Sequence, residues 1–260
     1  MQRRPALLAV LIVLLLAVGG GAAAWALFLR GDEIAPLALP SAGPAATAAA
    51  GDGSTGPTSG TPLGTGGGSL PPASAGSVDA ASLPGTWSIA PDSVVGYRVR
   101  ERLASLAADS DAVGRTSSIS GTATIAGGGS SLTVSAASFT VDMTSLRSDR
   151  QMRDNRLRND GIQTDQFPTA TFVLSAPVPL PATATSGPFD VTLHGDLTLH
   201  GVTKTVDIAA KAQLNGSVIQ VLGSLDFPFS DYAINAPNIG GFVAVEDHGT
   251  LEFLVNLAKG

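Results

Sequence analysis

Five arginines are concentrated in one short segment of this sequence, within residues 142–172. Four of them recur at every third position: Arg147, Arg150, Arg153 and Arg156. On a helix, side chains with this spacing climb one flank as a shallow spiral. Such a flank has the charge to hold an anionic head group at the mouth of an apolar pocket, and Arg153 and Arg156 are the candidates for that role.

The alternative for the same segment is a solvated helix surface tied by local ion pairs. Asp149 with Arg153 and Asp154 with Arg158 have the i,i+4 spacing of opposite charges, which contributes little to stability at an exposed position. Ser148 and Gln151 have the S-x-x-Q spacing of a capping box. The spacing therefore predicts a short helix that begins at this point and acts as a lid.

Three histidines are the other candidates for chemistry: His194, His200 and His248. The first two are six residues apart in a strand-like segment, about 20 Å on a straight strand, which is too far to share one metal ion. His200 precedes Gly201, so it is either a hydrogen-bonding turn residue or a group that orients a ligand. We expect no metal site and no cofactor.

Catalysis requires a nucleophile, a base and a group that orients the base, and the sequence offers no such set. It contains no cysteine, no G-x-S-x-G elbow and no G-K-[ST] phosphate loop. Carboxylates such as Asp149 and Asp154 lie among arginines, where ion pairing accounts for them. We therefore expect that the protein is not an enzyme.

Short alternating segments with turn residues between them must position these side chains. Asn215 and Gly216 lie between two such segments and form the strongest hairpin signal in the chain. A change of phase at Ala137 and Ser138 suggests a bulge. The spacing predicts an all-β fold, an antiparallel lipocalin-like barrel of about eight strands with a short helical lid.

Six apolar residues of these segments are candidates for the lining of such a barrel: Phe139, Val141, Phe172, Leu197, Leu199 and Phe227. An apolar tube binds an aliphatic chain with about 0.8 kcal/mol for each buried methylene. The alternative is that the same side chains fill a small barrel completely. The pattern of residues does not distinguish a hollow tube from a solid core.

Two motifs carry a resemblance to a known family. Residues 153–158 read R-D-N-R-L-R before F-P-T-A-T-F at 167–172, and residues 195–204 read GDLTLHGVTK. Over about residues 86–260 the chain resembles the YceI-like family. The resemblance implies a lipocalin-like barrel that holds an isoprenoid or another amphiphilic lipid. Asp92, and Asn155 with Arg156, stand where histidines are common in the family, so any role of those histidines is not carried over.

The motifs add residues to the apolar candidates. The complete candidate ligand-binding set is Phe139, Val141, Arg153, Asp154, Arg156, Leu157, Phe167, Phe172, Leu197, Leu199, His200 and Phe227.

The first 30 residues predict a membrane anchor. Residues 6–29 carry no charge and follow Arg3 and Arg4, and as a helix they span about 36 Å, enough to cross a bilayer core of about 30 Å. The arginines should stay cytoplasmic, which makes the rest of a single-pass protein of the cell membrane extracytoplasmic. The alternative is a signal peptide cleaved near residues 22–24, which would give a secreted protein.

Residues 31–84 predict a disordered linker, since they contain 8 Pro and 11 Gly among Ala, Ser and Thr. The predicted organisation is thus an anchor at 1–30, a linker at 31–84 and a barrel domain at 85–260. The formal net charge is -6, which argues against nucleic acid as a partner.

Three functions fit these expectations. The first is a membrane-tethered, extracytoplasmic binding or carrier protein for an isoprenoid or fatty-acyl lipid. The second is a cell-surface scaffold or adhesion module with a solid core, which displays loops such as residues 229–242 to a protein. The third, and least favoured, is an enzyme that modifies a lipid, which would need a polar cluster inside the barrel around His200 and Asp154.

Overall fold

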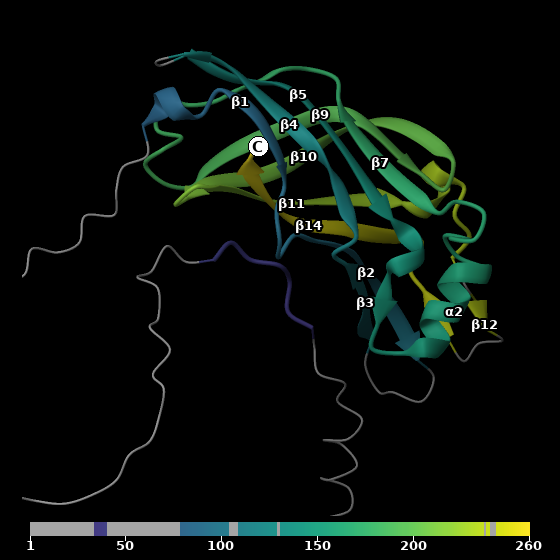
Figure 1. The fold of residues 1–260 in the computed structure, drawn as a ribbon. Helices are drawn as coiled ribbons and strands as arrows, with labels where there is room; N and C mark the ends of the chain where they lie inside the picture. Colours follow the sequence, from purple (N-terminus) through teal and green to yellow (C-terminus); the bar gives the residue numbers. More distant parts are fainter. Residues whose placement is uncertain (1–33, 41–78, 104–108, 129–130, 237, 240–242) are drawn as a thin grey trace, which may run out of the picture. The chain divides into compact units, whose positions relative to one another are not determined.

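Antiparallel strands make up most of the computed structural model, which describes residues 34–40, 79–103, 109–128, 131–236, 238–239 and 243–260 (Figure 1). Eight strands pair in a closed cycle that begins at β1 and ends at β14, because β14 also pairs with β1. In spatial order they are β1 (Gly85–Ile89), β4 (Ile119–Gly128), β5 (Ser131–Asp142), β7 (Thr169–Leu174), β9 (Phe189–Leu199), β10 (Val202–Asn215), β11 (Val218–Pro228) and β14 (His248–Lys259). The prediction of an all-β, eight-stranded antiparallel barrel is confirmed.

Further strands extend the barrel wall at one end. Strand β14 pairs with β1 through residues 257–259 and with β2 through residues 250–254, so β1 and β2 follow one another along the same edge. The extension and the short elements around it are β2 (Val94–Leu103), β3 (Ser110–Thr116), β6 (Arg147–Ser148), β8 (Val178–Pro179), β12 (Asn238–Ile239) and β13 (Val243–Val245), with the 3-10 turns η1 (Ala80–Ser82), η2 (Met143–Ser145) and η3 (Phe229–Tyr232).

Helix α2 (Gln151–Asn159) lies at the extended end of the barrel, near β2, β3 and β12 (Figure 1). A short helix in this segment was predicted, but the predicted capping box is wrong. The N-cap is Arg150, without a side-chain cap, because Ser148 belongs to strand β6. Its backbone N–H and its hydroxyl both donate to the Asp154 carboxylate, at 2.9 and 2.7 Å. The predicted ion pair of Asp149 and Arg153 is confirmed. Asp154, which was predicted to pair with Arg158, accepts hydrogen bonds from Ser148 instead.

Two local predictions for the strands had different outcomes. The hairpin at Asn215 and Gly216 is confirmed, since β10 and β11 pair up to Asn215 opposite Val218. The position predicted for the bulge, at Ala137 and Ser138, is wrong by two residues. The register between β4 and β5 shifts at Ser135, which lies between the partners of Thr124 and Ile125. A bulge is therefore present in β5, but its exact position depends on how β5 pairs with β4.

The apolar side chains form two clusters that are continuous with each other. One surrounds Trp87 and Leu257, and the other surrounds Tyr232 and Leu199. Partly buried side chains such as Phe172 pack against both clusters. The interior is thus apolar along the whole barrel, as the alternation of residues predicts.

The predicted anchor at 1–30 and most of the predicted linker lie outside the described residues. In the part of the chain that the structure describes, no helix has the length and apolar character needed to cross a membrane. Residues 34–40 form neither helix nor strand.

Candidate functional site

An apolar cavity of about 210 Å³ runs along the inside of the barrel. It extends from Trp87 and Leu214 to Tyr97 and Ile162, and almost all of its lining is aliphatic or aromatic. Six of the residues predicted for the lining do line it: Phe139, Val141, Phe172, Leu197, Leu199 and Phe227. The structure thus has a hollow interior, the alternative that sequence patterning left open.

Aromatic rings that pack closely over glycines account for part of the hollow interior. Tyr97 of β2 faces Gly114 of β3, and Phe253 of β14 faces Gly223 of β11. A Cβ at either glycine would lie 2.4 Å from the facing ring, closer than any side chain tolerates. Because each ring occupies the place of the missing side chain, it lies against the wall and leaves the middle of the barrel open.

The same arrangement explains part of the GDLTLHGVTK motif. Gly195 of β9 lies under the ring of Phe172 of β7, where a Cβ would be 2.4 Å from the ring. Phe172 itself comes from the F-P-T-A-T-F motif. The two motifs therefore fit together in space and shape the wall of the cavity.

A second cavity, also of about 210 Å³, lies at the end of the barrel that carries α2. Arg150, Arg153, Arg156 and Leu157 contribute to its lining, together with Met152, Glu101 and apolar residues of β2 and η3. Three side chains line both cavities: Tyr97, Ile162 and Phe227. They form the partition between the two chambers.

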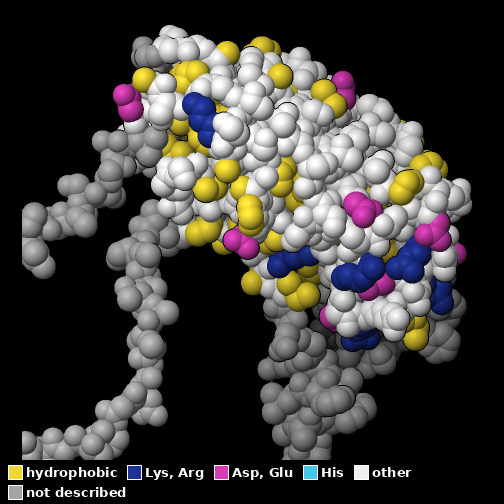
Figure 2. Space-filling view, viewed as in Figure 1, with side chains coloured by type: hydrophobic (Ala, Val, Ile, Leu, Met, Phe, Trp, Pro, Cys, Tyr) yellow, Lys and Arg dark blue, Asp and Glu magenta, His cyan; other side chains and the backbone are white. Residues whose placement is uncertain are grey.

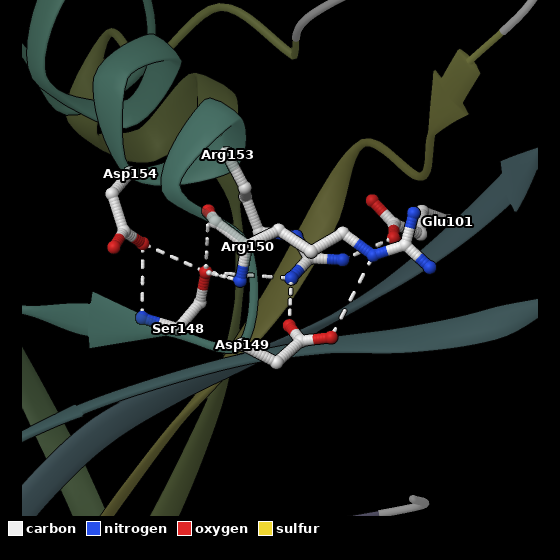
Figure 3. Close-up of polar contacts among 6 residues, drawn as sticks. All are labelled: Glu101, Ser148, Asp149, Arg150, Arg153 and Asp154. Atoms are coloured by element: carbon white, nitrogen blue, oxygen red, sulfur yellow. Dashed lines mark hydrogen bonds and ion pairs between the residues drawn. The ribbon is translucent and has the colours of Figure 1, made fainter. Parts of the chain in front are cut away.

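Arg153 is the most tightly held of the arginines (Figure 3). Its guanidinium donates to Glu101 at 2.5 Å and forms an ion pair with Asp149. Its side chain is only 15% exposed, and that of Glu101 is 8% exposed. Burial alone lowers the pKa of Arg153, but the hydrogen bonds and charges of Glu101 and Asp149 raise it above its usual value. Arg153 thus acts as a charged link between α2 and β2.

The other two arginines of the second cavity also have acidic partners. Arg150 lies 3.6 Å from Asp149, and Arg156 lies 3.9 Å from Asp160. Together with Glu101, three carboxylates face these three arginines, so the charges that line the second cavity are balanced. Figure 2 shows lysine and arginine side chains interspersed with acidic ones over the region of α2.

His200 and Phe167 line neither cavity. His200 and Gly201 both have positive φ, 51° and 74°, and make the two-residue turn between β9 and β10. The ring nitrogens of His200 contact the Tyr232 carbonyl at 2.9 Å and the Gln163 amide oxygen at 3.2 Å, and Phe167 packs edge-on against the ring. Of the alternatives, His200 is the hydrogen-bonding turn residue.

Asp154 also lies outside the lining of both cavities, since it is buried and holds Ser148. Among the described residues, no group of three or more His, Asp or Glu side chains is arranged to hold a metal ion. The interior of the barrel therefore presents apolar surface with few polar groups.

The hydroxyl of Tyr97 is an exception to this apolar interior. It is buried and has no hydrogen-bond partner among the described residues, a property it shares with the hydroxyl of Tyr232. Burial raises the pKa of Tyr97 above its usual value of 10.0, an effect that Arg153 partly opposes. Tyr97 therefore stays protonated at neutral pH and presents an unused donor beside the partition.

Sequence reasoning missed Tyr97, Ile162 and Glu101 as parts of this region. Tyr97 is not among the predicted candidates, and Glu101 gave no signal because its partner Arg153 is 52 positions away. One signal was available: Gly96, Tyr97 and Gly114 place glycines around an aromatic residue in a strand segment, where a glycine indicates close approach of a ring or a backbone.

A closed antiparallel barrel around an apolar cavity, with a short helix at one end, defines a lipocalin-like protein. More narrowly, the chain belongs to the YceI-like family, whose model, a YceI-like domain, matches residues 87–257.

Relatives and solved structures are similar to parts of this chain. A UPF0312 protein of Vibrio vulnificus strain YJ016 is 30% identical over 124 residues, which cover 45% of this chain and 62% of that protein, and a UPF0312 protein of strain CMCP6 matches equally. The chain thus spans less than two thirds of the length of these relatives.

Two solved structures are also similar to this chain. A polyisoprenoid binding domain from Saccharophagus degradans, implicated in plant cell wall breakdown, has a TM-score of 0.51 at 19% identity, covering 67% of this chain and 98% of that one. BcnA of Burkholderia cenocepacia has a TM-score of 0.46 at 20% identity, covering 62% and 95%. At 19% identity, the similarity to the Saccharophagus degradans domain is a similarity of fold.

Proposed function

We propose that this protein binds and carries an amphiphilic lipid, with the apolar chain of the lipid inside the barrel. The observation that carries the proposal is the apolar cavity between Trp87 and Tyr97. A cavity lined by aliphatic and aromatic side chains stays dry and favours an apolar occupant. Each methylene buried there contributes about 0.8 kcal/mol to binding.

An isoprenoid is the class of lipid that we favour, with a fatty-acyl chain as the alternative. Membership of the YceI-like family supports this choice, as does the printed description of the Saccharophagus degradans domain as polyisoprenoid binding. The branched methyl groups of an isoprenoid also suit a wall of rings and small residues such as Ala137 and Ala170.

Membrane attachment and an extracytoplasmic barrel are further parts of the proposal, and their support is the sequence of residues 1–84. An uncharged stretch after two arginines favours a single-pass anchor, and the Pro- and Gly-rich segment favours a flexible linker. A tether of this kind would keep a lipid carrier close to the membrane from which it takes its cargo.

The two other functions receive less support. A scaffold module was expected to have a solid core, whereas this barrel is hollow. An enzyme that modifies a lipid was expected to have a polar cluster in the barrel, whereas His200 and Asp154 are hydrogen-bonded outside both cavities.

The test is the identity of the lipid that copurifies with the full-length protein from bacterial membranes, measured by mass spectrometry after solvent extraction. Two neighbouring alanines of β5 provide matched variants: Ala137 lines the cavity and Ala136 is exposed. We expect wild type and Ala136→Leu to carry the same lipid and Ala137→Leu to lose most of it, with circular dichroism as the check on folding. Equal amounts of lipid on both variants, or none on wild type, would contradict the proposal.

A further inference from the structure

We propose that Tyr97 recognises the head group of the lipid, and that this head group is an uncharged oxygen, such as that of an alcohol, a carbonyl or an ether, rather than a phosphate or a carboxylate. The inference rests on the proposed function and concerns the specificity of the same site. It is argued from the hydroxyl of Tyr97, from the charges of the second cavity and from the place of the partition.

The first observation is the hydroxyl itself. A buried hydroxyl without a partner is costly, and a phenylalanine would fill the same space without that cost. Unsatisfied buried groups in a native structure call for an explanation, often an absent partner. Tyr97 lines both cavities, next to Phe227 and Ile162, so a bound lipid at the partition is placed to supply the missing acceptor.

The second observation is the neutrality of the second cavity. Every arginine in its lining already has a carboxylate within 4 Å: Arg150 and Arg153 share Asp149, Arg153 also pairs with Glu101, and Arg156 pairs with Asp160. A phosphate head group would have to displace these partners and would leave Glu101 buried beside a second anion. An uncharged head group leaves the pairs intact.

The third observation is the position of the ring. Tyr97 lies against Gly114, whose Cβ, if present, would come within 2.8 Å of the Tyr97 hydroxyl oxygen. One side of the Tyr97 ring therefore packs against the barrel wall, and the other side faces the two cavities. A lipid whose tail lies in the first cavity and whose head group lies at the partition places one oxygen near this hydroxyl. The second cavity accommodates the rest of the head group.

Tyr232 provides a matched control. Its hydroxyl is also buried and also lacks a partner among the described residues, yet Tyr232 is not part of the lining of either cavity. Tyr97→Phe and Tyr232→Phe thus each remove a buried hydroxyl without a partner among the described residues, and only the first removal affects the lining of the cavities. Any general effect of losing a buried hydroxyl appears in both variants.

The experiment measures equilibrium binding of three probes with the same saturated C20 chain to the full-length protein: phytanol, phytanyl diphosphate and the hydrocarbon phytane. The chain has two tryptophans, Trp25 and Trp87, so occupancy is followed by fluorescence in a Trp25→Phe background, where the emission comes from Trp87 in the lining of the first cavity. For wild type we expect the alcohol to bind about tenfold more tightly than either of the other two, the effect of one hydrogen bond. Tyr97→Phe should lose this advantage and keep its affinity for phytane, and Tyr232→Phe should behave as wild type.

Three results would overturn the inference. If Tyr97→Phe binds the alcohol as tightly as wild type, or if the diphosphate binds more tightly than the alcohol, Tyr97 does not select an uncharged head group, while the lipid carrier stands. If none of the three probes binds, the inference falls together with the proposed function.

Discussion

Arg153 of helix α2 and Glu101 of strand β2 form an ion pair of 2.5 Å in which both side chains are largely buried. The pair joins the only α-helix of the described residues to the extended edge of the barrel (Figure 3). Since a buried charge without a partner is strongly destabilising, neither residue can change alone without a large effect.

Removing the charge of Arg153 should therefore cost more than removing an exposed one. We expect Arg153→Met to lower the free energy of unfolding by about 3 kcal/mol, because Glu101 is left buried and unpaired. Arg156→Met, which breaks an exposed contact of 3.9 Å with Asp160, should cost less than about 1 kcal/mol. Urea unfolding followed by circular dichroism measures both. Restoring part of the loss with Glu101→Gln in the Arg153→Met background would assign it to the pair, and equal losses in the two single variants would refute the assignment.

Stability should fall at alkaline pH because of the tyrosines. The chain has two, Tyr97 and Tyr232, and burial raises the pKa of both above 10.0, that of Tyr232 to about 12. The unfolded chain ionises first, so the stabilising contribution is complete below pH 10 and is lost as the pH rises from there through the folded-state values. Near-ultraviolet absorbance should show little tyrosinate in the folded protein at pH 10, and a titration of the folded protein with a midpoint near 10 would contradict this.

A methyl group at Gly223 should disturb the cavity wall. Its Cβ would lie 2.4 Å from the ring of Phe253, so the ring has to move into the lumen. We expect Gly223→Ala to lower the free energy of unfolding by about 1–3 kcal/mol, the usual effect of overpacking, and to reduce lipid binding. Gly187→Ala is the control, because nothing lies within 4 Å of the Cβ position there. Similar thermal unfolding curves for the two variants would argue against the ring-on-glycine arrangement.

Asp154 should matter for the order of α2 rather than for ligand contact. Asp154→Ala removes both hydrogen bonds from Ser148, which should cost about 1–3 kcal/mol because the donors are partly buried. Trypsin, which cleaves after arginine, should then cut within α2 faster than in wild type. Asp160→Ala, at the end of the helix, should leave the cleavage rate nearly unchanged, and the prediction fails if the two variants are cut alike.

The barrel and much of its lining were predictable because they depend on alternation along single strands. Phe139, Phe172 and Leu197 were identified as lining residues in this way, and Asn215 with Gly216 marked a hairpin. These signals are local, so each can be recognised without knowing which strands pair.

The hollow interior was not predictable, because it depends on which residues face each other across strands. Phe253 can take its position only because Gly223 is opposite, thirty positions earlier in the chain. One of the two acidic partners of Arg153, Glu101, likewise comes from β2, far from the helix in the sequence. Without the strand pairing, only the local partner Asp149 is visible in the sequence, and the buried partner Glu101 is not.

The rings that lie on glycines also have a kinetic consequence. Because Tyr97 and Phe253 rest against the wall before any lipid is present, the lumen is preformed and a lipid chain need not wait for the core to rearrange. The rate of association should then be set by extraction of the lipid from its bilayer, and the dwell time by the length of the buried tail. At about 0.8 kcal/mol per methylene, each added methylene slows departure about fourfold. If the proposed function holds, such a barrel discriminates among lipids by residence time.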